Sequence, residues 1–150
     1  MTLEKFEHIG RNMMITDKYF KLYLRDALAP YELNATEGVV LLMMFHSAVA
    51  QKNTQEDLIR RIHYDKGVMT RTMKELEQKG YVLREANPAD SRSFLFSLTE
   101  KGAALKEPLF DAMRRWNERL LAGIDEHDLE TVKTVLGKMA QNAYGNAVTE

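Results

Sequence analysis

Apolar residues recur at helical spacing near both ends of the chain. In the first thirty residues this series ends at Pro30 and comprises Phe6, Ile9, Met13, Phe20 and Leu24. A second series ends at Gly123 and comprises Leu105, Leu109, Met113, Trp116 and Leu120. A third follows the N-cap candidate Asp125 and comprises Leu129, Val132, Leu136 and Met139. Both ends of the chain are therefore predicted to form long amphipathic helices.

The segment between these ends predicts three shorter helices. The first two begin with capping-box spacing, in which Asn34 is followed by Glu37 and Thr54 is followed by Asp57. Residues 39–45 are apolar nearly all round, which predicts that the first of these helices is buried.

The third short helix is predicted to begin after Asp65 and to end at Gly80. One face of this helix is apolar and carries Met69, Met73 and Leu76. The opposite face is polar and carries Lys66, Thr70, Arg71 and Lys74. The second and third helices are separated by a brief turn, which is typical of a helix-turn-helix.

A β-hairpin is predicted next, because the strings YVLREA and SFLFSL flank the turn-forming sequence NPADSR. Thr99 is then predicted to cap a single helix that continues to Leu120. The predicted fold is mainly α with a small β-wing, a winged helix-turn-helix. We expect one domain, with residues of about 34–98 forming the winged helix-turn-helix and residues of about 1–30 and 99–146 forming dimerisation helices.

The hairpin turn carries an acid and a base two residues apart, Asp90 and Arg92. We predict that the Asp90 carboxylate restrains the Arg92 guanidinium at the tip of the hairpin. The alternative is an ordinary exposed ion pair, which contributes roughly 0–1 kcal/mol.

Composition and charge narrow the functional classes. A chain of 150 residues without cysteine excludes disulfides and thiolate metal sites. No apolar run approaches the roughly 20 residues of a membrane helix, and no signal peptide is evident. These features favour a cytoplasmic protein without membrane contact. The net charge is -1, but residues 58–85 hold seven Lys or Arg against four Asp or Glu.

The polar face of the third short helix has the residue types that contact DNA. Arg can bond guanine bidentately, and Thr can touch a thymine methyl or form a hydrogen bond. Thr54 and Gln55 begin the preceding helix, where free N–H groups favour phosphate. Arg92 suits a narrow minor groove. The alternative for all of these residues is a solvated surface without a nucleic-acid partner.

The stretch from Thr54 to Glu85, followed by DSRSFLFSLTEKG, resembles the multiple-antibiotic-resistance-regulator (MarR) family of bacterial transcription factors. Besides Leu58, the matching pieces are the Asp65-Lys66 helix start, Thr70-Arg71, Leu76-Glu77, Lys79-Gly80, and the wing signature Asp90-x-Arg92 leading to Leu98-Thr99-x-x-Gly102. The helices on either side match in order and length, so the resemblance covers essentially the whole chain.

The resemblance implies a homodimer that binds a palindromic operator in double-stranded DNA, usually as a repressor. The implied major-groove residues are Lys66, Gly67, Thr70, Arg71 and Lys74. The implied wing residues are Asp90, Ser91, Arg92 and Ser93. Two positions depart from the family pattern. Gly67 stands where the family often has Ser or another side chain able to form a hydrogen bond, and Gly38 stands where a bulky residue is usual, which alters the pocket under the buried helix.

The resemblance also implies a small aromatic or phenolic effector. The candidate residues for binding it are His8, Arg11, Tyr19, Phe45 and His46, and the alternative for each is an ordinary core or surface role. The histidines His8, His46, His63 and His127 lack metal-ligand spacing, so no metal is predicted. No phosphate-binding, dinucleotide-binding or nucleophile motif occurs, so neither a cofactor nor catalysis is expected.

Two further alternatives remain open at this point. The winged helix could serve protein–protein contact without binding DNA, although its outer face is polar rather than apolar. The chain could also be a small-molecule-binding protein or an enzyme that works in a dimer cleft. For the terminal helices, the alternative to dimerisation is that they fold back on their own domain.

Overall fold

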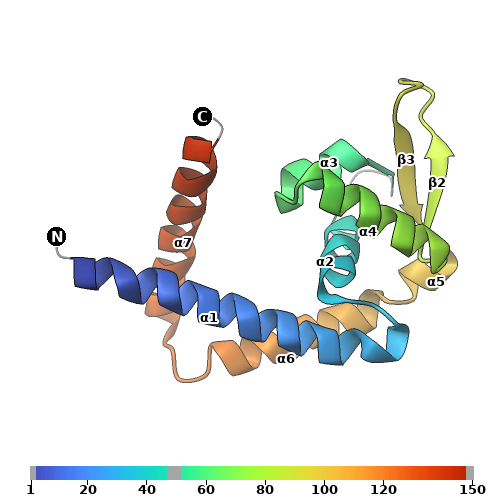
Figure 1. Cartoon of the computed structure of the whole chain (residues 1–150). Helices are drawn as coiled ribbons and strands as arrows, with labels where there is room; N and C mark the ends of the chain where they lie inside the picture. Colours follow the sequence, from blue (N-terminus) through green and yellow to red (C-terminus); the bar gives the residue numbers. More distant parts are fainter. Residues whose placement is uncertain (1–2, 47–51, 148–150) are drawn as a thin grey trace. The chain divides into compact units, whose positions relative to one another are not determined.

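The computed structural model describes residues 3–46 and 52–147. The chain divides into two compact units, Met1–Arg114 and Arg115–Glu150. The elements of the first unit, shown in Figure 1, are α1 (Leu3–Leu28), a 3-10 turn (Ala29–Tyr31), α2 (Ala35–Phe45), β1 (Asn53–Thr54), α3 (Gln55–Ile62), α4 (Lys66–Gln78), β2 (Val82–Ala86), β3 (Phe94–Leu98) and α5 (Glu100–Ala103). Helix α6 (Lys106–Leu120) begins in the first unit, and α7 (Glu126–Ala147) lies in the second. The predicted mainly helical fold with a small wing is confirmed.

The predicted helix starts are confirmed by side-chain hydrogen bonds. Asn34 and Glu37 form a complete capping box on α2, and Thr54 and Asp57 form another on α3. Asp65 caps α4 by accepting a hydrogen bond from the N–H of Val68 at 2.8 Å. These local bonds satisfy N–H groups that a helix start otherwise leaves without partners.

The sheet has a third strand that the sequence analysis did not predict. Strands β2 and β3 pair antiparallel as the expected hairpin, and β1 pairs with the other edge of β3. Because Thr54 belongs to β1 and also caps α3, the start of α3 is fixed against the wing. We use "the wing" for residues 82–98.

The predicted single helix from Thr99 to Leu120 is wrong, because it is interrupted between α5 and α6. Proline inside a helix lacks an N–H donor and clashes with the carbonyl four residues earlier. The interruption at Ala104 and Leu105 places Pro108 in the first turn of α6, where neither problem arises.

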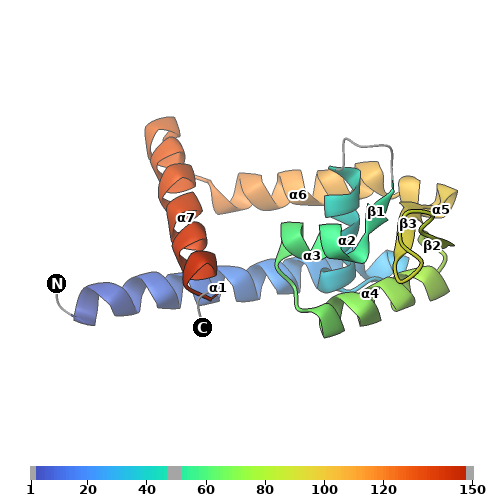
Figure 2. The ribbon, with the colours of Figure 1, turned by 90° about the horizontal axis from the view of Figure 1, so that it is seen from above.

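The core of the first unit surrounds α2, which contacts α1, α3 and α4 (Figure 2). The terminal helices contribute to it as well, through Leu24 and Leu28 of α1 and through Leu105 and Leu109 before and within α6. Gly38 permits close packing here, since a Cβ atom at this position would lie 2.3 Å from the Leu28 Cδ1 atom. Parts of both terminal segments therefore do fold onto their own domain.

The base of the wing is joined to the end of α4 by a set of hydrogen bonds around Thr99. Its hydroxyl donates to the Gly80 carbonyl at 2.6 Å, and its N–H donates to the Tyr81 carbonyl at 3.1 Å. The hydroxyl also accepts a bond from the N–H of Gly102 at 3.0 Å. A Cβ atom at Gly102 would lie 2.1 Å from the Tyr81 carbonyl oxygen, so this position requires glycine.

Gly102→Ala should therefore lower the free energy of unfolding by about 1–3 kcal/mol, as expected for overpacking against backbone atoms. Gly10→Ala is the matched control, because a Cβ at Gly10 meets no atom within 4 Å. Alanine in an open helical position should leave stability equal or raise it by about 0.5–1 kcal/mol. Urea denaturation of both variants measures the difference. Equal stabilities would contradict the close approach described above.

Candidate nucleic-acid interface

Helix α4, which we call the recognition helix, has the two faces that the sequence predicts. The buried face is apolar apart from Thr72, and it comprises Met69, Thr72, Met73 and Leu76. The five residues predicted to contact the major groove are all exposed: Lys66, Gly67, Thr70, Arg71 and Lys74. The same helix therefore packs on the core and presents a polar surface to solvent.

The tip of the wing is ordered by backbone hydrogen bonds. The Asp90 carboxylate accepts a bond from the backbone N–H of Arg92 at 2.9 Å, and the Ser93 N–H donates to the Asp90 carbonyl at 3.1 Å. The Asn87 amide donates to the Ser93 hydroxyl at 2.8 Å and also accepts a bond from the N–H of Ala89. These bonds fix the turn that carries Ser91 and Arg92.

The prediction that Asp90 holds the Arg92 guanidinium is wrong. The carboxylate bonds the peptide N–H of Arg92 instead, which is the short-range turn geometry that Asp favours. Within the described part of the chain, the guanidinium makes no hydrogen bond or ion pair. The tip thus has a defined backbone and an extended cationic side chain.

Two concave surfaces connect α3, the recognition helix and the wing. The first, of about 220 Å³, is lined on its polar side by Thr54, Gln55, Glu56, Lys66, Arg92 and Ser93. The second, of about 350 Å³, is lined in part by Gln55, Thr70, Lys74 and Arg84. Five predicted DNA contacts from three separate elements therefore meet in the first surface, and Gln55 belongs to both.

A hydrogen bond between α3 and the recognition helix was not predicted. The Gln55 side-chain amide donates to the Thr70 hydroxyl at 2.7 Å. The two residues are 15 positions apart, so no local sequence pattern indicates this contact.

The start of α3 is also stabilised electrostatically. Hydrogen bonding to the Thr54 side chain and to the Thr54 backbone N–H lowers the pKa of Asp57, and the nearby Arg60 lowers it further. Asp57 is consequently ionised at neutral pH. Its negative charge at the first turn is favourable because the N-terminus of a helix carries partial positive charge.

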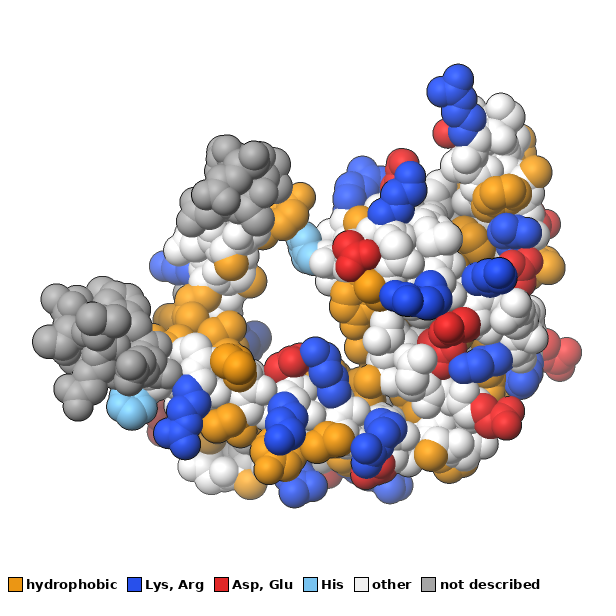
Figure 3. Space-filling view, viewed as in Figure 1, with side chains coloured by type: hydrophobic (Ala, Val, Ile, Leu, Met, Phe, Trp, Pro, Cys, Tyr) orange, Lys and Arg blue, Asp and Glu red, His pale blue; other side chains and the backbone are white. Residues whose placement is uncertain are grey.

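The cations of this region fall into two groups. Some are engaged within the chain: Arg60 with Asp57, Arg61 with the Met43 carbonyl, Lys79 with Glu37, and Arg84 with Glu77. Four others have no acidic partner among the described residues: Lys66, Arg71, Lys74 and Arg92. Figure 3 shows basic side chains over α3, α4 and the wing, with acidic side chains among them. The unpaired cations lie on the recognition helix and the wing tip.

The predicted effector residues lie in two places. His8, Arg11 and Tyr19 are on exposed positions of α1. Phe45 and His46 both pack against Phe110, with ring centroids 6.2 and 5.2 Å away. The structure therefore brings Phe45 and His46 together, and the effector role of all five residues stays a prediction.

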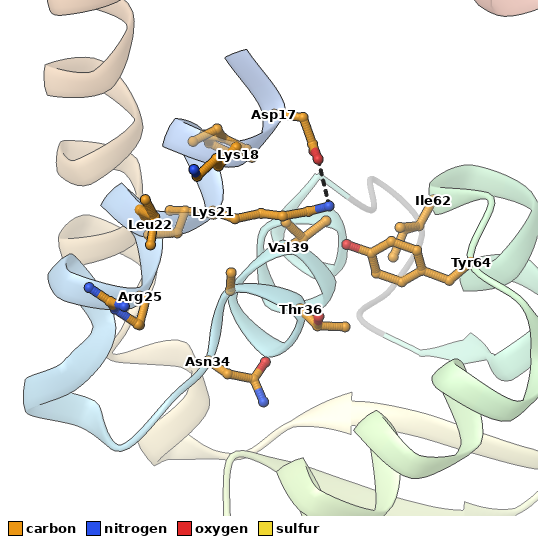
Figure 4. Close-up of a pocket in the computed structure, with 13 residues that line it drawn as sticks. Asp17, Lys18, Lys21, Leu22, Arg25, Asn34, Thr36, Val39, Ile62 and Tyr64 are labelled. Carbon is orange, nitrogen blue, oxygen red and sulfur yellow. Dashed lines mark hydrogen bonds and ion pairs between the residues drawn. The ribbon is translucent and has the colours of Figure 1, made fainter. Parts of the chain in front are cut away.

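A separate cavity of about 780 Å³ lies between α1, the start of α2 and the turn after α3. None of the five predicted effector residues lines it. Figure 4 shows the Lys21 ammonium directed toward the Tyr64 hydroxyl and paired with Asp17, at 2.7 Å. Lys18 and Arg25 add positive charge, and the apolar part of the lining includes Phe20, Leu22, Leu24, Val39 and Ile62.

Two titratable groups of this cavity have shifted pKa values. The hydrogen bond from Lys21 to Asp17 raises the pKa of the Lys21 ammonium, which therefore stays protonated. Burial raises the pKa of the Tyr64 hydroxyl, although Lys21 opposes the shift, so this hydroxyl is a neutral donor at physiological pH. The Lys21–Asp17 ion pair and one hydroxyl donor thus face the same space.

Residues 3–46 and 52–147 contain no group of three or more His, Asp or Glu side chains placed to hold a metal ion. In the same part of the chain, no helix combines the length and the apolar character needed to cross a bilayer.

Comparison with known proteins gives one consistent family. A sequence model described as the MarR family matches residues 33–94. The HTH-type transcriptional regulator SarZ of Staphylococcus aureus is 34% identical over 131 residues, which cover 87% of this chain and 82% of SarZ. The HTH-type transcriptional regulator BilQ of Clostridioides difficile is 29% identical over 119 residues, covering 77% of this chain and 76% of BilQ.

Solved structures agree with this result. A MarR transcriptional regulator from Methanosarcina mazei superposes with a TM-score of 0.83 at 26% identity, covering 93% of this chain and 98% of that one. A mutant MarR from E. coli in complex with operator DNA superposes with a TM-score of 0.79 at 25% identity, covering 93% and 99%. Because SarZ is more than 30% identical over most of both chains and the MarR model matches the central segment, the chain belongs to the MarR family of transcriptional regulators, which are not enzymes.

Proposed function

We propose that this chain is a homodimeric, ligand-responsive repressor that binds a palindromic DNA operator. The observation that carries the proposal is the placement of unpaired cations. Lys66, Arg71, Lys74 and Arg92 have no acidic partner among the described residues, whereas neighbouring cations are engaged within the chain. Phosphate oxygens and base acceptors would supply the missing partners.

Each unpaired cation has a role that fits its position. Arg71 lies on the exposed face of the recognition helix, where a guanidinium can bond guanine O6 and N7 bidentately. Lys66 and Lys74 lie on the same face and suit phosphates. Arg92 projects from an ordered turn, and the minor groove attracts such a side chain through its negative potential. The similar E. coli MarR was solved with operator DNA, which supports this docking.

The homodimer is supported by apolar side chains that the single chain leaves exposed. In α1, the side chains of Ile9, Met13, Met14 and Tyr19 are 50%, 48%, 74% and 56% exposed. In the second unit, the exposed set includes Ile124, Val132, Val135, Leu136 and Tyr144. Contiguous exposed apolar surface usually marks an interface. Two copies of these helices would cover one another.

The cavity beside Lys21 supports the ligand response. Its charged lining residues are Lys18, Lys21 and Arg25 against one acid, Asp17, beside the Tyr64 hydroxyl and apolar side chains. This excess of positive charge suits an aromatic or phenolic anion. Tyr64 directly precedes Asp65, the N-cap of the recognition helix. A ligand wedged between α1 and Tyr64 would therefore shift the recognition helix relative to α1 and change DNA affinity.

Selection from a random duplex pool should yield a palindromic site. Arg71→Ala should relax base preference at one position in each half-site and cost roughly 1–3 kcal/mol. Arg92→Ala should weaken binding and reduce the dependence of affinity on salt, since fewer counterions are released. Fluorescence anisotropy at several salt concentrations measures both effects.

Lys133→Ala is the charge-matched control, because Lys133 pairs with Glu130 on α7 and belongs to neither the recognition helix nor the wing. It should bind the selected duplex nearly as the wild type does. Failure to select any duplex, or Arg71→Ala and Arg92→Ala variants that bind like the control, would contradict the proposed DNA contacts.

The wild-type protein should sediment at about twice the chain mass of 17.3 kDa. Met14→Glu should shift it toward a monomer, because the proposed partner helix cannot bury an unpaired carboxylate without a large cost. Leu83→Glu is the control, since Leu83 is 51% exposed but lies on the wing. A monomeric wild type, or a Met14→Glu variant that remains as dimeric as the control, would rule out this interface.

Titration with benzoate and with phenols should release the selected duplex. Lys21→Met should raise the concentration of benzoate needed for release by about tenfold or more, because it removes a charge-assisted hydrogen bond of roughly 1.5–3 kcal/mol. DNA binding without ligand should not change, and Lys133→Met should titrate like the wild type. An unaltered titration in Lys21→Met would exclude this cavity as the effector site.

A further inference from the structure

The hydroxyl group of Thr70 is committed to bonds within the protein. It donates its proton to the Lys66 carbonyl at 2.8 Å, one turn earlier in the recognition helix. It also accepts a hydrogen bond from the Gln55 side-chain amide at 2.7 Å. Thr70 is nevertheless exposed. The residue thus faces solvent with its donor already in use.

These two bonds limit what Thr70 can recognise. A hydroxyl has one proton and two lone pairs, so Thr70 retains one lone pair and its methyl group. Guanine presents two acceptors, N7 and O6, in the major groove and needs a donor. Thymine presents a methyl group beside its O4 acceptor, and a side-chain methyl can pack against it.

We propose that Thr70 recognises the 5-methyl group of a thymine through its own methyl group, and that Gln55 is the positioning residue that holds Thr70 for this contact. The inference rests on the proposed DNA binding by the recognition helix. It adds a base preference of stated chemistry to a residue that the family resemblance predicts only in or beside the major groove.

Gln55 is suited to the positioning role because it connects two elements that both approach DNA. It is the first residue of α3, and its bond to Thr70 spans to the recognition helix. Without that bond, the Thr70 side chain is held only by the Lys66 carbonyl of its own helix. The Gln55 side chain keeps its carbonyl oxygen and a second N–H for other partners.

The test replaces each thymine of the selected operator by uracil, one at a time in both half-sites. This change removes the 5-methyl group and leaves the base-pairing groups in place. At one position, the substitution should lower the affinity of the wild-type protein for the duplex by about fourfold per half-site, because one methyl group is no longer buried. Thr70→Val keeps a methyl group, and valine in a helix strongly prefers one χ1 rotamer without help from Gln55, so this variant should keep the thymine-to-uracil ratio. Thr70→Ser keeps the hydroxyl and should lose the ratio.

Gln55→Leu tests the positioning role through the same ratio of affinities for the thymine and uracil duplexes. Any phosphate contact that Gln55 makes itself affects both affinities equally and therefore leaves the ratio unchanged. The ratio should fall in Gln55→Leu, and the fall should vanish in a Thr70→Val background, where no hydroxyl remains to be held. Equal melting temperatures of the variants separate this effect from misfolding.

Other results would overturn the inference. The proposal is wrong if no thymine-to-uracil change weakens wild-type binding. It is also wrong if Thr70→Val loses the base preference and Thr70→Ser keeps it, because the hydroxyl is then the recognising group. A wild type that binds no selected duplex would instead refute the proposed function itself, and this inference with it.

Discussion

The arrangement of this winged helix depends on one buried ion pair, between Glu37 and Lys79. The Glu37 side chain is fully buried in α2, and the Lys79 ammonium donates to its two oxygens at 2.6 and 2.9 Å and to the Glu32 carbonyl at 2.8 Å. One Glu37 oxygen also accepts the backbone N–H of Asn34, so the cap of α2 and the end of the recognition helix share one carboxylate. Removing one partner of such a pair costs about 3–5 kcal/mol because a buried charge is left alone. The partial exposure of Lys79 places this pair toward the lower end of that range.

The backbone of Lys79 also takes part in the junction at the base of the wing. The Lys79 carbonyl accepts a hydrogen bond from Lys101 at 2.7 Å, and the Lys101 ammonium also lies 4.3 Å from the centre of the Tyr81 ring. Thr99 and Gly102 complete the junction through the carbonyls of Gly80 and Tyr81. Most of the sequence signature around Lys79-Gly80 and Leu98-Thr99-x-x-Gly102 therefore forms the structural framework that joins the end of the recognition helix to the base of the wing. It sets the angle between the recognition helix and the wing, and the groups proposed to contact DNA extend from that framework at Arg71 and Arg92.

Sequence reasoning predicted those features that depend on neighbouring residues. The caps at Asn34, Thr54 and Asp65 need partners only three positions away, and the apolar face of the recognition helix follows from its period. Contacts between distant residues leave no such pattern in the sequence. Strand β1 has only two residues and is defined by its pairing with β3. The Gln55–Thr70 and Glu37–Lys79 contacts join residues that are 15 and 42 positions apart. The helix interruption before α6 was predictable, because Pro108 is visible in the sequence. The Asp90 prediction was wrong because a carboxylate two residues before a peptide N–H bonds that group more readily than a long, mobile guanidinium.

Helix α1 connects the proposed dimer contact to the proposed DNA surface. Its C-terminal part supplies Leu24 and Leu28 to the core, while Ile9, Met13 and Met14 nearer its start are exposed. A continuous helix of 26 residues extends about 39 Å, which is comparable with the roughly 34 Å between successive half-sites on one face of DNA. In the proposed dimer, the spacing of the two recognition helices would thus be set by rigid helices and not by a flexible linker. Because the Lys21 and Tyr64 cavity lies where α1 meets the turn before the recognition helix, a ligand there would act on this spacing, and a small local displacement would suffice to mismatch two half-sites at once.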